Sequence, residues 1–179
     1  KEKYGPDSIM GTGSARGPGN EANYIMQKFM RATIGTNNVD HCARVWHAPS
    51  VAGLAYSLGS GAMSNSIPEI EDADLLFIFG YNGADSHPIV ARRIVRAKEK
   101  GATLITVDPR VTETARISDM HLPIKGGTNM ILVNAFGNVL INENLYDEEF
   151  IKEHTDNFEE YKKIVEPYTP EYAAKYTNI

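Results

Sequence analysis

The middle of the chain alternates apolar runs with an amphipathic stretch. Residues 74–79 and 103–107 are mostly apolar, and residues 89–100 between them have apolar positions at helical spacing. Short apolar runs are typical of strands buried on both faces, and a strand–helix–strand order implies parallel strands with a right-handed crossover. A third strand is expected near 120–124. The pattern therefore predicts an α/β fold with a Rossmann-like parallel sheet flanked by helices.

Apolar residues recur at helical spacing in three further stretches, 20–34, 49–58 and 129–140. Pro49 stands in the first turn of the second stretch, where proline is tolerated. The third stretch is apolar enough to pack inside the domain. Near the N-terminus, residues 8–10 are expected to form a short strand that runs into a glycine-rich loop.

A chain of 179 residues is long enough for one domain with a substantial core. We expect a single α/β domain over residues 1–179, excised from a larger enzyme, because the chain begins abruptly without methionine. Residues 1–35 are predicted to enter from a neighbouring domain. Residues 145–179, which are acidic and broken by Pro167 and Pro170, are predicted to form a helical C-terminal extension.

Charge and composition exclude several classes of protein. The net charge of −5 argues against nucleic-acid binding, which needs a concentrated basic surface. No apolar run is long enough for a membrane span and no signal peptide is visible, so a cytoplasmic location is expected. The locally basic stretch 91–100 is predicted to be the solvated face of a helix. A single cysteine, Cys42, excludes an internal disulfide and a cysteine-only metal site.

Residues 40–50 are predicted to be a loop, and they bring together a thiol, two imidazoles, a guanidinium and the only tryptophan. A metal ligand needs a lone pair, and an indole N–H only donates, so Trp46 cannot bind a metal. Its usual role would be a buried aromatic anchor. His41, Cys42 and His47 are a weak metal site because a fourth ligand is missing. Cys42 is expected to be a small buried hydrophobe, and His47 is either a structural histidine or a proton acceptor.

Polar loops follow the two clearest predicted strands, at 80–87 and 108–110. Ligands of open parallel sheets bind outside the carboxyl ends of the strands, so both loops are candidates for a nucleotide site. Glycines at 80 and 83 would let backbone N–H groups approach a pyrophosphate, but their spacing is not the GxGxxG fingerprint of NAD sites. The alternative is that Asp108 merely ends a strand and Gly126–Gly127 merely starts a helix.

Many short strings, in order over almost the whole chain, resemble the formate dehydrogenases of the molybdopterin oxidoreductase family. The strings include residues 14–17, 24–30, 34–38, 49–54, 61–65, 79–82, 85–90, 108–110, 113–117 and 119–121. In the family, a Cys-Ala-Arg-Val segment is followed by selenocysteine or cysteine, then by His, a small residue, Pro and Ser. Residues 42–50 resemble this metal-binding loop, with Trp46 at the chalcogen position.

The resemblance implies a parent protein that is the catalytic (alpha) subunit of a selenocysteine-type formate dehydrogenase, as in methanogens and anaerobic bacteria. Such an enzyme oxidises formate to carbon dioxide at a bis-molybdopterin guanine dinucleotide centre with molybdenum or tungsten. A 4Fe-4S cluster in a missing N-terminal part and an electron-transfer subunit or carrier are also implied. Trp46 and His47 would stand at the catalytic positions of metal ligand and proton acceptor. The fragment alone is expected to be inactive.

The resemblance also implies a set of residues that bind one guanosine diphosphate arm of the cofactor. These are Gly80, Asn82, Asp85, Ser86, His87, Asp108, Arg110, Gly127 and Thr128. Three arginines, Arg16, Arg44 and Arg116, either line an anionic pocket or pair with carboxylates.

Three other functions stay open. One is a nucleotide-binding regulatory or scaffold module without redox chemistry, which a native Trp46 would favour. Another is a different molybdopterin oxidoreductase such as a nitrate reductase, against which residues 47–50 argue because they follow the formate-type pattern. The third is a hydrolase with Cys42 as nucleophile, which requires a thiol that reacts rapidly with alkylating agents. We further hypothesise that Trp46 marks a selenocysteine codon, UGA, decoded as tryptophan.

Overall fold

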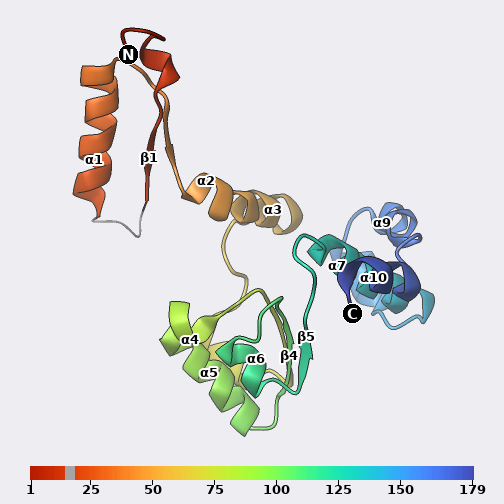
Figure 1. The fold of residues 1–179 in the computed structure, drawn as a ribbon. Coiled ribbons are helices and arrows are strands. Elements are labelled where there is room, and N and C mark those ends of the chain that lie inside the picture. The colour runs from red at the N-terminus through yellow and green to blue at the C-terminus, as the bar shows by residue number, and fades with distance from the viewer. Residues whose placement is uncertain (15–18) are drawn as a thin grey trace. The chain divides into compact units, whose positions relative to one another are not determined.

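The computed structural model describes residues 1–14 and 19–179, which form two compact units, Lys1–Asn65 and Ser66–Ile179. Both units combine helices with parallel strands (Figure 1), which confirms the predicted α/β class. The division between the units falls after residue 65, whereas the domain boundaries at 35 and 145 stay predictions. None of the helices in the described part of the chain is long and apolar enough to cross a membrane.

The first unit contains two short parallel strands joined through a helix. Its elements are a 3-10 turn Pro6–Ser8, β1 Gly11–Gly13, α1 Asn20–Phe29, a π-helical turn Met30–Ile34, β2 Val39–His41, α2 Ala43–Trp46 and α3 Ala48–Leu58. The helix predicted at 20–34 is confirmed, and it ends at Gly35 in the left-handed conformation, with φ of 86°. The helix predicted at 49–58 is also confirmed, as α3.

The strand predicted at 8–10 is wrong, because the strand lies at Gly11–Gly13 instead. Pro6 starts a 3-10 turn that occupies the preceding residues. The glycines of the strand leave room for side chains of α1, which packs directly against it. A Cβ at Gly11 would collide with Met26, and one at Gly13 would collide with Asn23.

The second unit is built around a three-stranded parallel sheet in the order β3-β4-β5. The strands are β3 Leu75–Phe79, β4 Thr103–Val107 and β5 Met120–Leu122. The helices are a 3-10 turn η3 Ile67–Asp72, α4 Gly83–Ser86, α5 Pro88–Glu99, α6 Glu113–Ile117, α7 Asn129–Asn142, α8 Glu148–His154, α9 Phe158–Val165 and α10 Pro170–Thr177. All three predicted strands and the helix between the first two are confirmed. Helices α8, α9 and α10 lie within residues 145–179, where a helical C-terminal extension is predicted.

One face of the sheet is covered by α5. The cluster on this face joins Ile78 and Leu104 of the sheet to Ile94 and Ala97 of the helix, and all four side chains are buried. The amphipathic pattern of 89–100 is therefore explained, because the apolar side of α5 faces the apolar side chains of the sheet. Burial of the leucine and the two isoleucines contributes roughly 1.5–3 kcal/mol each.

The opposite face of the sheet is only partly covered. Near the carboxyl end, Val107 packs against Ile124 and Leu132, and the last of these lies on α7. Nearer the amino end, Leu75 is 53% exposed and Phe77 is 42% exposed. The prediction that this strand is buried on both faces is therefore wrong over its first half.

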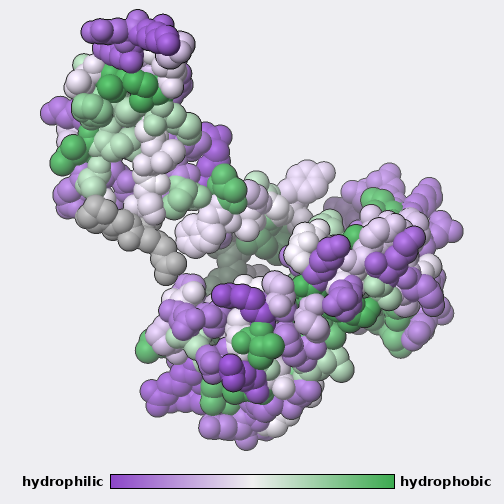
Figure 2. Space-filling view, viewed as in Figure 1, coloured by the Kyte–Doolittle hydropathy of each residue, from purple (hydrophilic) through white to green (hydrophobic). Residues whose placement is uncertain are grey.

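The long apolar helix α7 is likewise buried on one side only. It packs against α9 and α10, and Leu132 and Ala135 are buried, but Met130 is 70% exposed and Phe136 is 37% exposed. The prediction that this helix packs inside the domain holds for one face. Figure 2 shows such apolar residues, in green, at the surface of both units.

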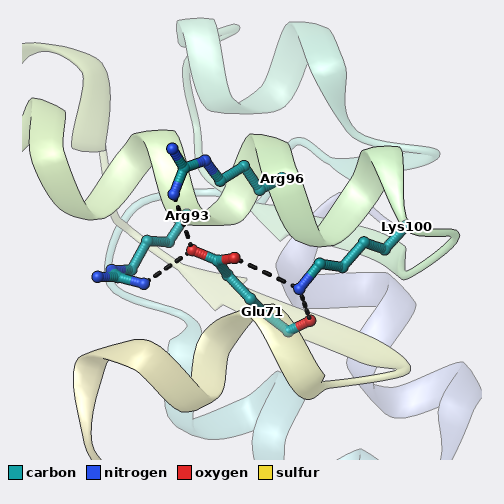
Figure 3. Close-up of polar contacts among 4 residues, drawn as sticks. All are labelled: Glu71, Arg93, Arg96 and Lys100. Atoms are coloured by element: carbon teal, nitrogen blue, oxygen red, sulfur yellow. Dashed lines mark hydrogen bonds and ion pairs between the residues drawn. The ribbon is translucent and has the colours of Figure 1, made fainter.

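The basic stretch 91–100 is more than a solvated helix face. Three of its cations bind the carboxylate of Glu71 in the 3-10 turn η3, at distances of 2.8 Å for Arg93 and 3.3 Å for both Arg96 and Lys100 (Figure 3). Burial alone would raise the pKa of Glu71, but the hydrogen bonds from Lys100 and Arg96 lower it below its ordinary value. The cluster ties α5 to η3, which corrects the prediction of a purely solvated face.

Candidate functional site

The nine residues predicted to bind a nucleotide lie on three loops at one edge of the sheet. Because β3, β4 and β5 are parallel, their carboxyl ends meet at this edge. Backbone hydrogen bonds hold the loop starts together: Gly80 N donates to Val107 O at 2.9 Å, and Asp108 N donates to Leu122 O at 3.2 Å. The edge is the usual ligand-binding position of an open parallel sheet.

The loop after β3 begins at Gly80, in the left-handed region with φ of 55°. The amide of Asn82 donates to the carboxylate of Asp85, and Asn82 immediately precedes the single turn α4, which contains Asp85. The carbonyl oxygen of the Asn82 side chain is buried and has no hydrogen-bond partner among the described residues. An unpaired buried acceptor costs about 1–3 kcal/mol, so a bound ligand with an N–H or O–H group would be favoured here.

Ser86 and His87 end the same loop. Both are exposed, and His87 precedes α5. The backbone N–H of His87 donates to Gly83 O at 2.9 Å. Their side chains therefore lie at the surface of the edge, where a ligand has access to them.

The loop after β4 is organised by Asp108, which is 5% exposed. Its carboxylate accepts a hydrogen bond from Arg110 N at 2.8 Å, which shapes the turn, and the Arg110 side chain is exposed. The backbone carbonyl of Asp108 accepts from Nε2 of His121 on β5 at 2.8 Å. His121 was not predicted as a residue that supports the site. Its position on the third predicted strand, beside the end of the second strand, could have indicated that it contacts the Asp108 loop.

The loop after β5 leads into α7 through Gly127, which has φ of 84°. Thr128 follows at the helix start, and its hydroxyl donates to Lys125 O at 2.6 Å. Gly126 and Gly127 therefore lie at the start of a helix, which is the alternative to ligand binding given above for this pair. Leu132, in the first turn of α7, packs against Val107 at the end of β4.

The segment predicted as a loop around Trp46 is helical. Trp46 N donates to Cys42 O at 3.2 Å and His47 N donates to Ala43 O at 3.0 Å, so α2 forms and runs almost directly into α3. Trp46 is 70% exposed, which excludes the buried aromatic anchor. The rings of Trp46 and His47 lie 6.0 Å apart at an angle of 52°, and His47 is also exposed.

Cys42 is exposed, so the prediction of a buried hydrophobe is wrong. Its sulfur lies 3.5 Å from the hydroxyl of Ser14 and 3.8 Å from Nδ1 of His41. The same Nδ1 accepts a hydrogen bond from Ala43 N at 3.2 Å, so its lone pair is engaged and it is a poor base for the thiol. No group of three or more potential metal ligands of the His, Cys, Asp and Glu types occurs within residues 1–14 and 19–179.

Two of the three arginines pair with carboxylates. Arg44 contacts Asp40 at 2.6 Å and Arg116 contacts Glu113 at 3.3 Å. The Arg44 guanidinium, followed by the backbone N–H of His41, holds the pKa of Asp40 below its ordinary value. Arg16 lies outside the described residues.

Comparison with known proteins gives consistent matches. The family described as Molybdopterin oxidoreductase matches residues 1–167. The chain is 63% identical over 179 residues to formate dehydrogenase H of Escherichia coli (strain K12), covering 100% of this chain and 25% of that protein. It is 52% identical over 178 residues to F420-dependent formate dehydrogenase 1 subunit alpha of Methanococcus maripaludis, covering 99% and 26%.

Among solved structures, acetylene hydratase from Pelobacter acetylenicus has a TM-score of 0.70 at 27% identity, covering 99% of this chain and 24% of that one. The chain thus spans about a quarter of the length of the curated relatives described above.

Proposed function

The chain belongs to the molybdopterin oxidoreductase family, and from this premise we propose that it is the part of a formate dehydrogenase catalytic subunit that binds one guanosine diphosphate arm of a bis-molybdopterin guanine dinucleotide. The parent enzyme would oxidise formate to carbon dioxide. The proposal draws on the relatives that are named formate dehydrogenases. The observation that carries it is the convergence of the three loops on one sheet edge, where Asn82 has a buried acceptor without a partner.

The residues present suit a nucleotide. The Asn82 side-chain carbonyl and the Asp108 carboxylate accept hydrogen bonds, and ribose hydroxyls and guanine N–H groups donate them. The exposed guanidinium of Arg110 is a donor for phosphate oxygens. Backbone at Gly80 and Gly127 has no Cβ, so phosphate groups can approach closely. Asp85, Ser86, His87 and Thr128 complete the polar surface of the edge.

When bound, the cofactor supplies a molybdenum or tungsten centre that takes the electrons of formate oxidation. His47 is proposed to accept the proton, because imidazole exchanges protons near neutral pH. Trp46 cannot bind the metal, so the chain as it stands is proposed to be inactive. A 4Fe-4S cluster and an electron-transfer subunit or carrier are part of the same proposal for the parent enzyme.

Nucleotide binding is testable with GDP as the probe for the arm. We expect the 179-residue chain to bind GDP in calorimetric titration, and Asp108→Asn to weaken binding about 10- to 100-fold, because a hydrogen bond to a charged group is lost. Asparagine keeps the oxygen that accepts from Arg110 N, so the turn should persist. Glu113→Gln, which removes an exposed carboxylate on α6, is the matched control and should bind GDP as the unvaried chain does.

The origin of Trp46 is decided by its codon. A UGA codon in the source gene would support the proposal that the native residue is selenocysteine, the metal ligand of a selenium-dependent formate dehydrogenase. A UGG codon would contradict it.

The second candidate function is a nucleotide-binding regulatory or scaffold module without redox chemistry. The observation that favours it is the indole of Trp46 at the ligand position, because an indole offers no lone pair to a metal. A UGG codon together with GDP binding would make it the better account. The hydrolase alternative is disfavoured because the His41 nitrogen nearest Cys42 already accepts a backbone hydrogen bond.

A further inference from the structure

Tyr81 stands between the end of β3 and Asn82, in the loop that begins at the carboxyl edge. Its hydroxyl is buried and has no hydrogen-bond partner among the described residues. The ring lies flat against that of His87, with centroids 5.8 Å apart and an angle of 20°. It also packs over Gly83, where a Cβ would collide with it. The ring is therefore held by packing, whereas the hydroxyl is not held by any described contact.

The ring and the hydroxyl of Tyr81 call for different explanations. Stacking on His87 and packing over Gly83 would be served equally well by phenylalanine. A buried hydroxyl without a partner destabilises the fold, and such groups are rare in native proteins unless a ligand, ion or water satisfies them. Asn82, the next residue, has a buried acceptor in the same condition. Two adjacent residues with unpaired polar atoms in one loop indicate a polar group that is brought by a ligand.

We infer that the Tyr81 hydroxyl donates a hydrogen bond to an oxygen of the bound nucleotide arm, beside the acceptor that Asn82 offers. The inference rests on the proposed function and adds a residue to its site. Ribose hydroxyl oxygens and phosphate oxygens are both suitable acceptors. Burial raises the pKa of the Tyr81 phenol, so the group stays protonated and acts as a donor at neutral pH.

Ligand access to the buried hydroxyl requires only a local shift. The turn α4 that follows Tyr81 is four residues long, and Ala84, Asp85 and Ser86 within it are exposed. A short exposed turn is a low-stability part of a fold. Its movement would open the Tyr81 hydroxyl, while the Tyr81 ring stays packed against the core cluster that contains Ile78 and Ile94.

The test is Tyr81→Phe in the 179-residue chain, with two measurements. The ring is kept, so the unfolding midpoint without ligand is expected to stay the same or rise, because an unpaired buried hydroxyl is removed. The affinity for GDP in calorimetric titration is expected to fall about fivefold, as the loss of one neutral hydrogen bond predicts. Tyr56→Phe is the matched control, because Tyr56 is 94% exposed and lies in the first unit, and it should change neither quantity.

The titrations also identify the acceptor. The measurement is repeated with 2′-deoxy-GDP and with pyrophosphate. If Tyr81→Phe weakens GDP and pyrophosphate alike, the hydroxyl contacts a phosphate oxygen. If it weakens GDP but leaves pyrophosphate or deoxy-GDP unaffected, the hydroxyl contacts the ribose. Either result supports the inference.

Three results would overturn it. Equal GDP affinity of the unvaried chain and Tyr81→Phe removes the role of the hydroxyl and leaves the proposed function standing. A lower unfolding midpoint with proportionally weaker binding assigns Tyr81 a structural role only. Absence of GDP binding by the unvaried chain overturns the inference together with the proposed function.

Discussion

The two units hold their candidate residues in different ways. In the second unit, the strand ends at Gly80 and Asp108 are tied to their neighbours by backbone hydrogen bonds, and Asp108 is almost fully buried. In the first unit, the backbone of α2 is regular, but Trp46 ends this helix of four residues and His47 follows it, and both side chains are exposed. The position of the proposed nucleotide-binding loops is thus fixed by sheet topology, whereas the orientation of the Trp46 and His47 side chains is not.

This difference shows which parts of a site the backbone fold can position without a ligand. Parallel strands bring their carboxyl ends to one edge whatever the side chains are, so polar residues placed just after the strands converge. A side chain on a short exposed helix has no such constraint, because its rotamer is set by packing or by a ligand. The proposed nucleotide-binding loop around Asp108 in the second unit is therefore preformed, whereas the His47 side chain in the first unit needs another contact to be positioned.

The largest expected effect comes from the core below the edge. Leu104 is fully buried between the sheet and α5, so Leu104→Ala should destabilise the second unit by about 2–5 kcal/mol. Leu58→Ala, at a side chain that is 62% exposed in the first unit, should change little. Urea titration measures the free energy of unfolding of each variant. Hydrogen exchange of segment 103–107 then reports the stability of β4 in each. Equal effects of the two substitutions would remove the contrast between the units.

A smaller effect is expected at the glycine pair before α7. Gly127 has φ of 84° and Gly126 does not lie in the left-handed region, and a methyl group at either position would meet no atom within 4 Å. Gly127→Ala should therefore cost about 1–2 kcal/mol through backbone strain alone, whereas Gly126→Ala should not. Thermal unfolding of the two variants distinguishes the effect of backbone strain from the effect of steric crowding by the added methyl group. A loss of stability in both would show that the loop has another constraint.

Acid sensitivity distinguishes a carboxylate that joins elements from one that pairs locally. Asp119 accepts from Leu104 N and from Lys98, in that order of effect, and both hold its pKa below the ordinary value. A depressed pKa in the folded state contributes stability above the unfolded value of about 3.9, and this contribution is lost as the pH falls through the folded pKa. Asp119→Asn should lower stability near neutral pH and flatten the decline below about pH 4.

Asp40→Asn is the companion variant in the first unit. Its partners, Arg44 and the backbone of His41, are close in sequence, and they also lower its pKa. We expect a weaker effect on the pH profile, because Arg44 is exposed and breaking this local pair disturbs no hydrogen bond between strands. Unfolding midpoints of both variants from acid to neutral pH provide the comparison. A larger loss of stability in Asp40→Asn than in Asp119→Asn would mean that the first unit, not the second, is the more constrained one.

The sheet was predictable from the sequence because each strand and the helix between them can be recognised from a short stretch of residues. The apolar runs at 75–79 and 103–107 and the amphipathic pattern between them are sufficient to specify strand, helix and strand. The exposure of Phe77 was not predictable in this way, because a strand's pattern does not say whether a helix covers both of its faces. Tyr81 was missed as well, since an unpaired hydroxyl is visible only once its surroundings are known. The helix α2 was missed because four residues carry too little periodicity.

The smallest effect is expected at Trp46, and it decides between two accounts of that residue. A tryptophan retained as a structural anchor would be buried, and its removal would cost about 3–5 kcal/mol. The side chain is 70% exposed, so Trp46→Ser should change the free energy of unfolding by no more than about 0.5 kcal/mol. Chemical denaturation monitored by circular dichroism measures this, with Val45→Ser, at an 86% exposed neighbour, as the control. A near-neutral result means that stability gives no reason for an indole at this position, which fits a site kept for chemistry. A loss above about 2 kcal/mol would instead make Trp46 a native structural residue and favour the module without redox chemistry.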